Sequence, residues 1–308
     1  MKDTVMFRFV PTMRCNFRCD YCFVDNNIKK NGKTMFDQHP VEEWINAIDA
    51  FDMYNIELYM WGGEPFCIDG TYALLRELTK RSFVIPGIRI DTNLFYADKI
   101  AELCPSNKIK LNCSYHMQYH TLDEELRKVC KLKALDMIGM VNFVASEYNL
   151  IHLRDDYGMT VADLVEIFAE KDVFLNVAGD FKYTNNNQYE RYDEYKEFIL
   201  QFISEREWNW LRGKENKREC IAGSHMFTVE YNGDFSCCID NKVRGNYFKG
   251  TLDRDISPKV CDKSCKSLVS YPFRCDNDFS SVNSLLAYVE RSKSYRRGRR
   301  QEYIDFEF

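Results

Sequence analysis

Short apolar runs alternate with longer amphipathic stretches along the first two thirds of the chain, and this alternation limits the choice of fold more than any other feature. Alternation of this kind is typical of repeated β/α units around a parallel sheet. Six such units in about 200 residues predict a partial (β/α)6 barrel, because a complete eight-fold barrel typically needs about 250 residues. Strands are expected at Val5–Val10, Ile56–Trp61, Ile88–Thr92, Ile109–Ser114, Met137–Val144 and Phe174–Val177, and helices at Val41–Phe51, Tyr72–Arg81, Asp123–Lys133 and Thr160–Glu170.

The regular alternation stops after a helix expected at Tyr189–Arg206, and the charged stretch Arg212–Glu219 is interpreted as a linker or surface loop. From Cys220 to Cys275 the chain holds six cysteines and one hairpin signal, Asn232–Gly233. A last helix is expected at Val282–Ser292, before a basic tail. We therefore expect three parts: an α/β barrel (1–210), a small cysteine-rich lobe (211–278), and a C-terminal helix with its tail (279–308).

Composition narrows the class of protein. Hydrophobic residues make up 45% of the chain and charged residues 29%, which is typical of a folded domain. The net charge of −5 argues against a protein that coats nucleic acid. No apolar run approaches the length of a membrane-spanning helix, and the N-terminus lacks the pattern of a signal peptide. A cytosolic, reducing compartment is expected, where disulfides are rare, so the 13 cysteines favour metal or cluster ligation.

Three of these cysteines, Cys15, Cys19 and Cys22, follow the first expected strand directly. Loops at the carboxyl ends of barrel strands are where α/β barrels place their active sites. Thiolate is the ligand that iron–sulfur clusters use, normally four per cubane. With no fourth cysteine nearby, one iron would stay open to a small molecule. The alternative is a zinc site completed by a distant ligand, for which His39 is the nearest candidate.

The spacing C-x3-C-x2-C on a loop after the first strand resembles the defining motif of the radical S-adenosylmethionine (SAM) superfamily. The resemblance implies a [4Fe–4S] cluster whose open iron chelates the methionine end of SAM. Tyr21 matches an aromatic position that packs on the adenine, although simple loop packing is the alternative. The segment Gly62-Gly63-Glu64-Pro65 follows the second strand and resembles the superfamily segment that binds the SAM amino group.

Other positions resemble the family less closely. Thr92, Asn93 and Ser114 end strands three and four, where relatives contact the cofactor. Arg127 resembles an arginine that pairs with the SAM carboxylate, with a helix-surface arginine as the alternative. Many relatives have Ser-x-Asp-Gly where this chain has Ser114-Tyr115-His116-Met117, and this departure puts His116 at the pocket.

The second cysteine group resembles the auxiliary-cluster domains named SPASM and twitch, through Cys220, Gly233 and Cys238. The C-x2-C-x5-C-x3-C run of a full SPASM domain is missing, so the shorter twitch version with one auxiliary [4Fe–4S] cluster is expected. The expected ligands are Cys220, Cys238, Cys261 and Cys265, with Cys275 as the alternative ligand. A small zinc ribbon is the other interpretation of this lobe.

A few further residues are candidates for chemistry. Cys237 is expected to point away from Cys238, because neighbouring side chains of a strand face opposite ways. It is a candidate hydrogen-atom donor to a substrate radical, as epimerase relatives use a cysteine. Asp180 and Lys182 follow the sixth strand. They are candidate substrate contacts, and an ordinary solvated strand end is the alternative. His116 and His120 are candidate acid/base groups.

The resemblance implies an oxidoreductase or tailoring enzyme that reductively cleaves SAM and abstracts hydrogen from a substrate carbon. A flavodoxin- or ferredoxin-type protein would supply the electron. A small-molecule or nucleotide substrate is expected, because the cysteine motif begins at residue 15 and leaves no room for an N-terminal peptide-recognition domain. A peptide substrate, for epimerisation or crosslinking, is the second hypothesis, and a zinc-stabilised binding protein the third. The basic run Arg291–Arg300 is a solvated tail or a contact for phosphate or nucleic acid.

Overall fold

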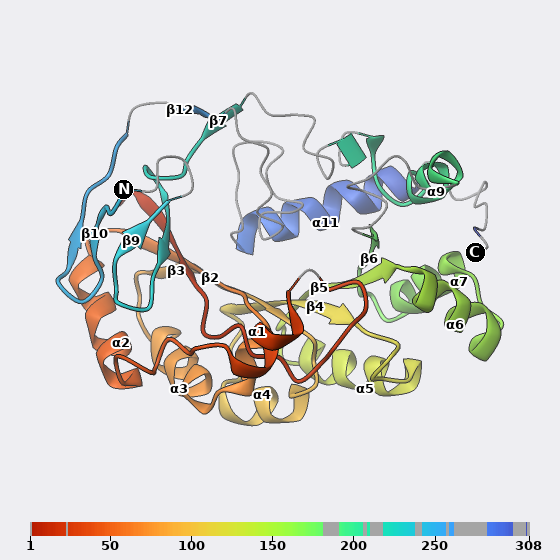
Figure 1. Ribbon diagram of the computed structural model, residues 1–308, viewed down its shortest axis with the longest axis horizontal. Coiled ribbons are helices and arrows are strands. Elements are labelled where there is room, and N and C mark those ends of the chain that lie inside the picture. The colour runs from red at the N-terminus through yellow and green to blue at the C-terminus, as the bar shows by residue number, and fades with distance from the viewer. Residues whose placement is uncertain are drawn as a thin grey trace.

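Figure 1 shows the computed structural model of the chain. The structure describes residues 2–22, 24–180, 191–205, 208–209, 218–237, 242–256, 259–261, 282–297 and 306. Of the expected site residues, Lys182, Cys238, Cys265 and Cys275 lie outside these ranges. The helices of the described residues are not long and apolar enough to cross a membrane.

Six parallel strands form the centre of the molecule, in chain order across the sheet. They confirm the expected partial α/β barrel, and each lies within a few residues of its expected position. β3 begins four residues early because Val84 and its neighbours still pair with β2. The strands are β1 (Thr4–Phe9), β2 (Asn55–Met60), β3 (Val84–Thr92), β4 (Ile109–Tyr115), β5 (Ile138–Ala145) and β6 (Leu175–Gly179).

The helices between residues 41 and 170 cover one face of this sheet, which we call the outer face (Figure 1). The expected helix at Val41–Phe51 is divided, since its last turn is a 3-10 helix. Helices α5 and α7 each begin with a capping box, at Thr121 and Thr160, which satisfies backbone N–H groups of the first turn. The helices are α1 (Asn26–Asn31), α2 (Val41–Ala47), η1 (Ile48–Phe51), η2 (Pro65–Cys67), α3 (Asp69–Leu78), α4 (Ala97–Leu103), α5 (Leu122–Lys133), α6 (Glu147–Tyr157), α7 (Val161–Glu170) and α9 (Tyr192–Ile199).

The two faces of the sheet differ in polarity. Alternate residues of each strand, such as Phe7, Leu58 and Ile90, point to the outer face and pack in the main core. The residues between them face the opposite way and include Arg8, Tyr59, Arg89, Asp91, Lys110, Asn112, Asn142 and Asn176. Small α/β barrels are normally filled by branched apolar side chains on this inner face. A polar inner face is therefore suited to binding a ligand.

The cysteine-rich region begins by extending the same sheet. β8 (Met226–Val229) pairs parallel with β1, and β9 (Phe235–Ser236) pairs antiparallel with β8. The expected hairpin turn at Asn232–Gly233 is confirmed, and Gly233 takes a φ of +82°, which favours glycine. Two short ribbons complete the region: β7 (Arg218–Cys220) with β12 (Lys259–Cys261), and β10 (Gly245–Asn246) with β11 (Thr251–Leu252). The expected linker at Arg212–Glu219 thus ends in a strand.

An aromatic cluster joins this region to the barrel. Tyr247 stacks on Trp44 of α2 at 5.3 Å between ring centroids and on Phe51 at 5.7 Å, and its hydroxyl donates to the Trp44 carbonyl at 2.7 Å. Phe235 of β9 packs on Phe7 at 4.9 Å. The barrel and the start of the cysteine-rich region therefore share one core.

The last helix, α11 (Val282–Arg297), lies on the side of the sheet opposite α2–α7 (Figure 1) and packs against β3 and β5. The expected helix ended at Ser292, with Arg291 already in a tail, and the structure corrects both boundaries. Arg296 explains the longer helix, because its guanidinium donates to the carbonyls of Phe202 and Leu175 and covers the Phe174 ring. A buried, bonded side chain of this kind holds the last turn in place.

Candidate functional site

The cysteine loop connects β1 to α1 and is held by backbone hydrogen bonds. The Cys15 N–H donates to the Lys29 carbonyl at 3.0 Å, and the Cys22 N–H donates to the Cys19 carbonyl at 3.1 Å. The second bond forms a turn that keeps Cys19 and Cys22 close in space. Cys19 is buried, and Cys15 and Cys22 are half-buried. The loop therefore carries three thiols at one end of the barrel.

Burial makes two of these thiols, those of Cys15 and Cys19, poor acids in the metal-free chain. It raises the pKa of Cys15 to about 11 and that of Cys19 to about 12, and the neighbouring thiols add to both effects. Within the described ranges, no three thiol, imidazole or carboxylate groups surround a common point closely enough to form a finished metal site. Three soft thiol donors on one short loop nevertheless fit an iron–sulfur cluster. Binding it would release protons and draw the loop together.

The segment Gly62–Pro65 packs directly on this loop. The Gly63 N–H donates to the Thr12 carbonyl at 3.0 Å, and the Glu64 N–H donates to the Arg14 carbonyl at 2.8 Å. A Cβ atom on Gly63 would lie 2.2 Å from the Arg14 oxygen, so only glycine allows this approach. The two segments that the sequence predicts to act together are thus hydrogen-bonded to each other.

Glu64 is buried and its carboxylate already has three hydrogen-bond donors. Oε1 accepts from the Phe66 N–H at 3.1 Å and the Thr92 hydroxyl at 3.0 Å, and Oε2 accepts from the Asn93 N–H at 2.7 Å. Desolvation by burial raises the pKa of Glu64 to about 7, although these donors oppose the shift. In this structure the carboxylate joins the end of β2 to the end of β3.

Asn93 connects the same strand end to the cysteine loop. Its side-chain amide donates to Asn16 Oδ1 at 2.9 Å and lies 3.8 Å from the Cys15 sulfur. The Asn16 amide nitrogen is buried and has no partner among the described residues, so a donor is available beside the thiols. Asn16 and Cys67 are not among the site residues that the motifs predict, and the Cys67 sulfur lies 3.8 Å from Asn16 Oδ1. Cys67 follows Pro65 by two residues in the sequence, and this short distance from the Gly62–Pro65 segment could have indicated that it lies near the cysteine loop.

On the other side of the loop, Tyr21 and His116 contact each other. The Tyr21 hydroxyl lies 2.6 Å from His116 Nδ1, the Cys19 sulfur lies 3.3 Å from the same nitrogen, and the two rings stack at 5.8 Å. Desolvation lowers the pKa of His116 to about 3, so its imidazole is neutral at ordinary pH. His116 is thus in direct contact with the cysteine loop.

The remaining expected site residues are more scattered. Ser114 faces the inner side of β4, opposite Asn142 of β5. Arg127 lies on the exposed side of α5, where it pairs with Asp98 at 3.3 Å, and the structure does not bring it to the cysteine loop. Asp180 is buried after β6, and its N–H donates to the Tyr195 hydroxyl at 2.7 Å. Cys237 is buried on the inner side with Met6, Tyr59 and Met226.

Two of the expected auxiliary ligands lie on paired strands. β7 and β12 are antiparallel neighbours, with Cys220 opposite Lys259 and Cys261 opposite Arg218. The backbone positions of Cys220 and Cys261 are therefore two register steps apart. The other expected auxiliary ligands lie outside the described residues.

A row of hydrogen-bonded polar side chains crosses the inner face below the cysteine loop. The Asp91 carboxylate accepts from the Tyr59 hydroxyl at 2.6 Å, from Arg89 at 3.0 Å and from the Asn112 amide at 2.8 Å. The row continues through amide-to-amide bonds of 2.6 Å and 2.9 Å, and its last donor is the Tyr288 hydroxyl of α11 at 2.8 Å. We call this row the polar row; its members are Tyr59, Asp91, Asn112, Asn142, Asn176 and Tyr288.

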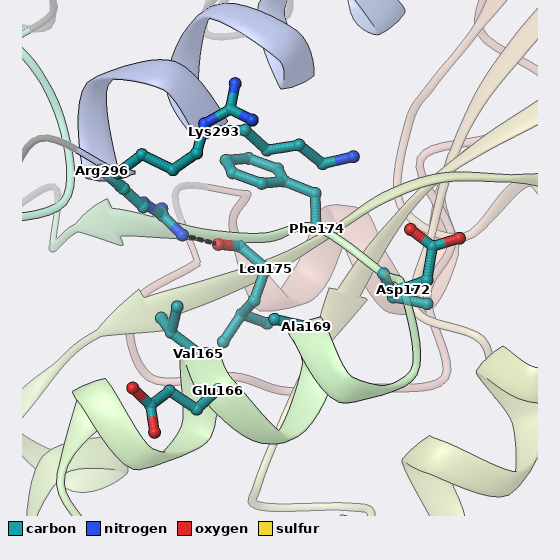
Figure 2. A pocket seen from close by; sticks show the side chains of 10 residues that line it. Val165, Glu166, Ala169, Asp172, Phe174, Leu175, Lys293 and Arg296 are labelled. Atoms are coloured by element: carbon teal, nitrogen blue, oxygen red, sulfur yellow. Dashed lines mark hydrogen bonds between the residues drawn. The ribbon is translucent and has the colours of Figure 1, made fainter. Parts of the chain in front are cut away.

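A separate cavity of about 290 Å³ lies between α7 and α11, as Figure 2 shows. Val165 and Glu166 line it from α7, and Lys293 and Arg296 line it from α11. Residues of the expected basic tail line this cavity, but none of the expected cofactor or metal ligands does. Because the thiols and Gly62–Pro65 lie elsewhere, we place the candidate site at the cysteine loop.

Known proteins resemble the part of the chain that contains this site. Residues 9–137 match the family model described as the Radical SAM superfamily, and that span contains the cysteine loop and Gly62–Pro65. A protein of Methanocaldococcus jannaschii that carries the provisional name of a glycyl-radical enzyme activating enzyme is 25% identical over 211 residues. The alignment covers 63% of this chain and 76% of that relative.

Solved structures with a similar fold are distant in sequence. Streptococcus suis SuiB bound to S-adenosylmethionine is 16% identical, with a TM-score of 0.52, over 80% of this chain and 64% of that chain. SuiB bound to precursor peptide SuiA is 17% identical, with a TM-score of 0.51, over 81% and 63%. Polyhistidine-tagged anSMEcpe with bound AdoMet is 15% identical, with a TM-score of 0.50, over 96% and 94%. The chain thus spans slightly less than two thirds of the SuiB chains, and the likeness is one of fold.

Proposed function

We propose that this chain acts as a radical SAM enzyme, in which Cys15, Cys19 and Cys22 hold a [4Fe–4S] cluster that binds SAM through its open iron. Residues 9–137 match the Radical SAM superfamily model. The observation that carries this assignment is the direct hydrogen bonding of Gly63 and Glu64 to the backbone before Cys15. Cluster and SAM, when bound, would supply a 5′-deoxyadenosyl radical that takes hydrogen from a substrate carbon. The protein itself binds, orients and excludes side reactions.

Residues around the cysteine loop would hold SAM. We propose that the backbone carbonyls of Gly62 and Gly63 receive its amino group. Glu64 would contribute its negative charge and hold the segment, since its oxygens already accept three protein donors. Tyr21 would pack on the adenine. Cofactor contacts are further proposed for Pro65, Thr92, Asn93, Ser114 and Arg127, the last only if SAM binding moves Arg127 away from Asp98.

We also propose an auxiliary [4Fe–4S] cluster in the cysteine-rich region. The pairing of β7 with β12 supports the choice of Cys220 and Cys261 as two of its ligands, because their backbones lie on adjacent strands. Cys238 and Cys265 would complete the set, with Cys275 as the alternative. An external flavodoxin- or ferredoxin-type protein would reduce the clusters.

The substrate would lie against the inner face of the sheet, below the cysteine loop. The polar row supports a small, polar substrate, since amide and carboxylate groups there can orient hydroxyl and amino groups by hydrogen bonds. Cys237 is the proposed hydrogen-atom donor, because it is buried on the same face beside Tyr59. Asp180 and Lys182 would contact the substrate from the end of β6, and His116 would contact it at the loop.

A peptide substrate is the second candidate, and one observation favours it. A fold of the same kind binds a precursor peptide in SuiB. Incubation in heavy water distinguishes epimerisation from dehydrogenation of the substrate. Deuterium in the product at the site of abstraction indicates that a thiol such as Cys237 returns a hydrogen atom, whereas a product two electrons more oxidised indicates dehydrogenation.

Anaerobic reconstitution with iron and sulfide tests the cluster assignment. The Cys15/Cys19/Cys22→Ala variant should hold about four fewer iron atoms per chain than the wild-type protein. Iron that remains counts the auxiliary cluster. Cys130→Ala, at an exposed position on α5, is the matched control and should retain all the iron.

The same preparations, reduced with dithionite, should convert SAM to methionine and 5′-deoxyadenosine only when the three cysteines are present. Zinc in place of iron, together with no SAM cleavage, would contradict the proposed function and favour a zinc-stabilised binding protein.

A further inference from the structure

Arg8 is a buried cation on the inner face of the sheet. It is the penultimate residue of β1, opposite Tyr59 of β2 on one side and Thr228 of β8 on the other. Only 9% of its surface is exposed. The strand alternation that sends Phe7 and Phe9 into the outer core turns Arg8 toward the proposed substrate.

The guanidinium of Arg8 forms no hydrogen bond and no ion pair with the described residues, and its Nε atom is buried without a partner. Arg89, one strand beyond Tyr59, differs in this respect. It donates to the Asp91 carboxylate at 3.0 Å, and its guanidinium lies over the Tyr59 ring at 4.5 Å from the centroid. Because a buried charge is costly unless it is paired, Arg8 requires an acceptor that the described protein does not supply.

Most neighbours of Arg8 supply donors or apolar surface, and the acid Glu57, opposite Met6, forms no ion pair with Arg8. Met6, Tyr59, Met226 and Cys237 pack together on this face with Trp61 beside them. The Trp61 indole N–H is also buried, with no partner in the part of the chain that the structure describes. Trp61 follows Tyr59 by two residues, so it lies on the same face, diagonally across from Arg8. The Arg8 guanidinium and the Trp61 indole thus share a surface on which the Asp91 carboxylate is already bonded to Arg89.

We propose that Arg8 is an anion-recognition residue, which binds a carboxylate or phosphate group of the substrate with help from the Trp61 indole. A guanidinium suits this task because its planar fork matches both groups in a bidentate manner. The assignment rests on the proposed function, since it takes the inner face as the substrate side. It makes the substrate an anionic molecule whose charged group lies near β1, beside Cys237.

Thermal unfolding of the purified protein tests the proposal, with inorganic phosphate and acetate as the two probes at matched ionic strength. Each should raise the Tm of the wild-type protein above its value in chloride, and the larger response tells a phosphate site from a carboxylate site. The Arg8→Met variant should lose the response. Because it removes an unpaired buried charge, its Tm without added anion should rise by about 2 to 4 °C.

Arg89→Met is the matched control on the same face. Its arginine is paired, so this variant should lower the Tm while the anion response remains. Arg8→Lys keeps the charge without the fork and should restore part of the response. The proposal is overturned if neither anion stabilises the wild-type protein, if the response survives Arg8→Met, or if Arg8→Met lowers the Tm as Arg89→Met does.

SAM cleavage by the reconstituted wild-type protein separates this proposal from the proposed function. A protein that responds to phosphate through Arg8 but does not cleave SAM would keep the anion site and lose the radical chemistry. A protein that cleaves SAM without any anion response would keep the radical chemistry and lose the anion site.

Discussion

Glu64 is a buried acid whose three donors come from two strand ends, and its titration is coupled to folding. Its pKa rises from 4.5 to about 7 because burial disfavours the ionised form. The folded chain thus holds the proton more tightly than the unfolded chain does. The stabilisation is fully present below pH 4.5 and is lost as the pH rises to about 7.

We therefore predict that the free energy of unfolding of the metal-free wild-type protein falls relative to that of Glu64→Gln across this pH range. The fall should be on the order of 3 kcal/mol, because one pKa unit corresponds to about 1.4 kcal/mol. Urea denaturation at several pH values measures it. Glu77→Gln is the control, since Lys80 lowers the pKa of that exposed carboxyl, and it should show no such fall. A difference between wild type and Glu64→Gln that does not change with pH would contradict the prediction.

At this scale, spacing along the sequence predicted which residues gather but not what they contact. Cys15, Gly63 and Asn93 come together because each follows the carboxyl end of a neighbouring parallel strand. The three donors to Glu64 depend on the path of two loops, which spacing does not give. Arg127 shows the same limit, since its position on α5 follows from periodicity while its pairing with Asp98 depends on how α4 packs.

The cysteine loop and the Gly62–Pro65 turn form one element pair, and their contact depends on the absence of a side chain. A methyl group at Gly63 would lie 2.2 Å from the Arg14 carbonyl and 2.5 Å from the Met13 carbonyl, which are backbone atoms with little freedom to move. We predict that Gly63→Ala displaces the loop and lowers iron retention after reconstitution several-fold. Iron quantification per folded chain measures this loss.

Gly158→Ala is the control variant, because it replaces a glycine at a position where the added methyl group meets no other atom. Gly158 ends α6 with a φ of +59° and has no atom within 4 Å of the added Cβ, so the cost should be about 1 kcal/mol of backbone strain. Its iron content should equal that of the wild type. If Gly63→Ala retained iron equally well, the close approach of the two segments would not be required for cluster binding.

Strands were predictable as elements because their outer faces are apolar without interruption, as in Val5, Phe7 and Phe9 of β1. Helix ends were less predictable. α11 continues past Ser292 because Arg296 finds three partners from distant parts of the chain. Local periodicity contains no information about such partners, so the basic run was expected to be a tail.

For the molecule as a whole, α11 matters because it covers the inner face near β5, opposite the layer formed by α2–α7 (Figure 1). Leu285 is fully buried there with Met140, Phe174, Tyr288 and Val289. Sequence periodicity predicted the helix but not the side of the sheet on which it lies, since either face offers apolar contacts. The last helix of the chain therefore covers part of the inner face of the barrel sheet.

We predict that Leu285→Ala lowers the free energy of unfolding by about 2 to 5 kcal/mol, the usual cost of a cavity in a core. Leu286→Ala on the same helix is the matched control, since Leu286 is 40% exposed and should cost much less. Urea denaturation of both variants measures the difference. Equal effects would indicate that α11 does not pack on the sheet through Leu285.

The polar row also has a direction. Each bond from Tyr288 through the asparagine side chains is donated toward Asp91, so the individual group dipoles point the same way and polarise one another. A β-sheet normally has little net dipole of its own. Here aligned side chains produce one between Tyr288 and Asp91, across the strands and at right angles to the backbone, and its positive end faces the Asp91 carboxylate. A substrate that lies across the inner face from β6 to β3 would therefore meet a surface whose electrical polarity has a fixed direction.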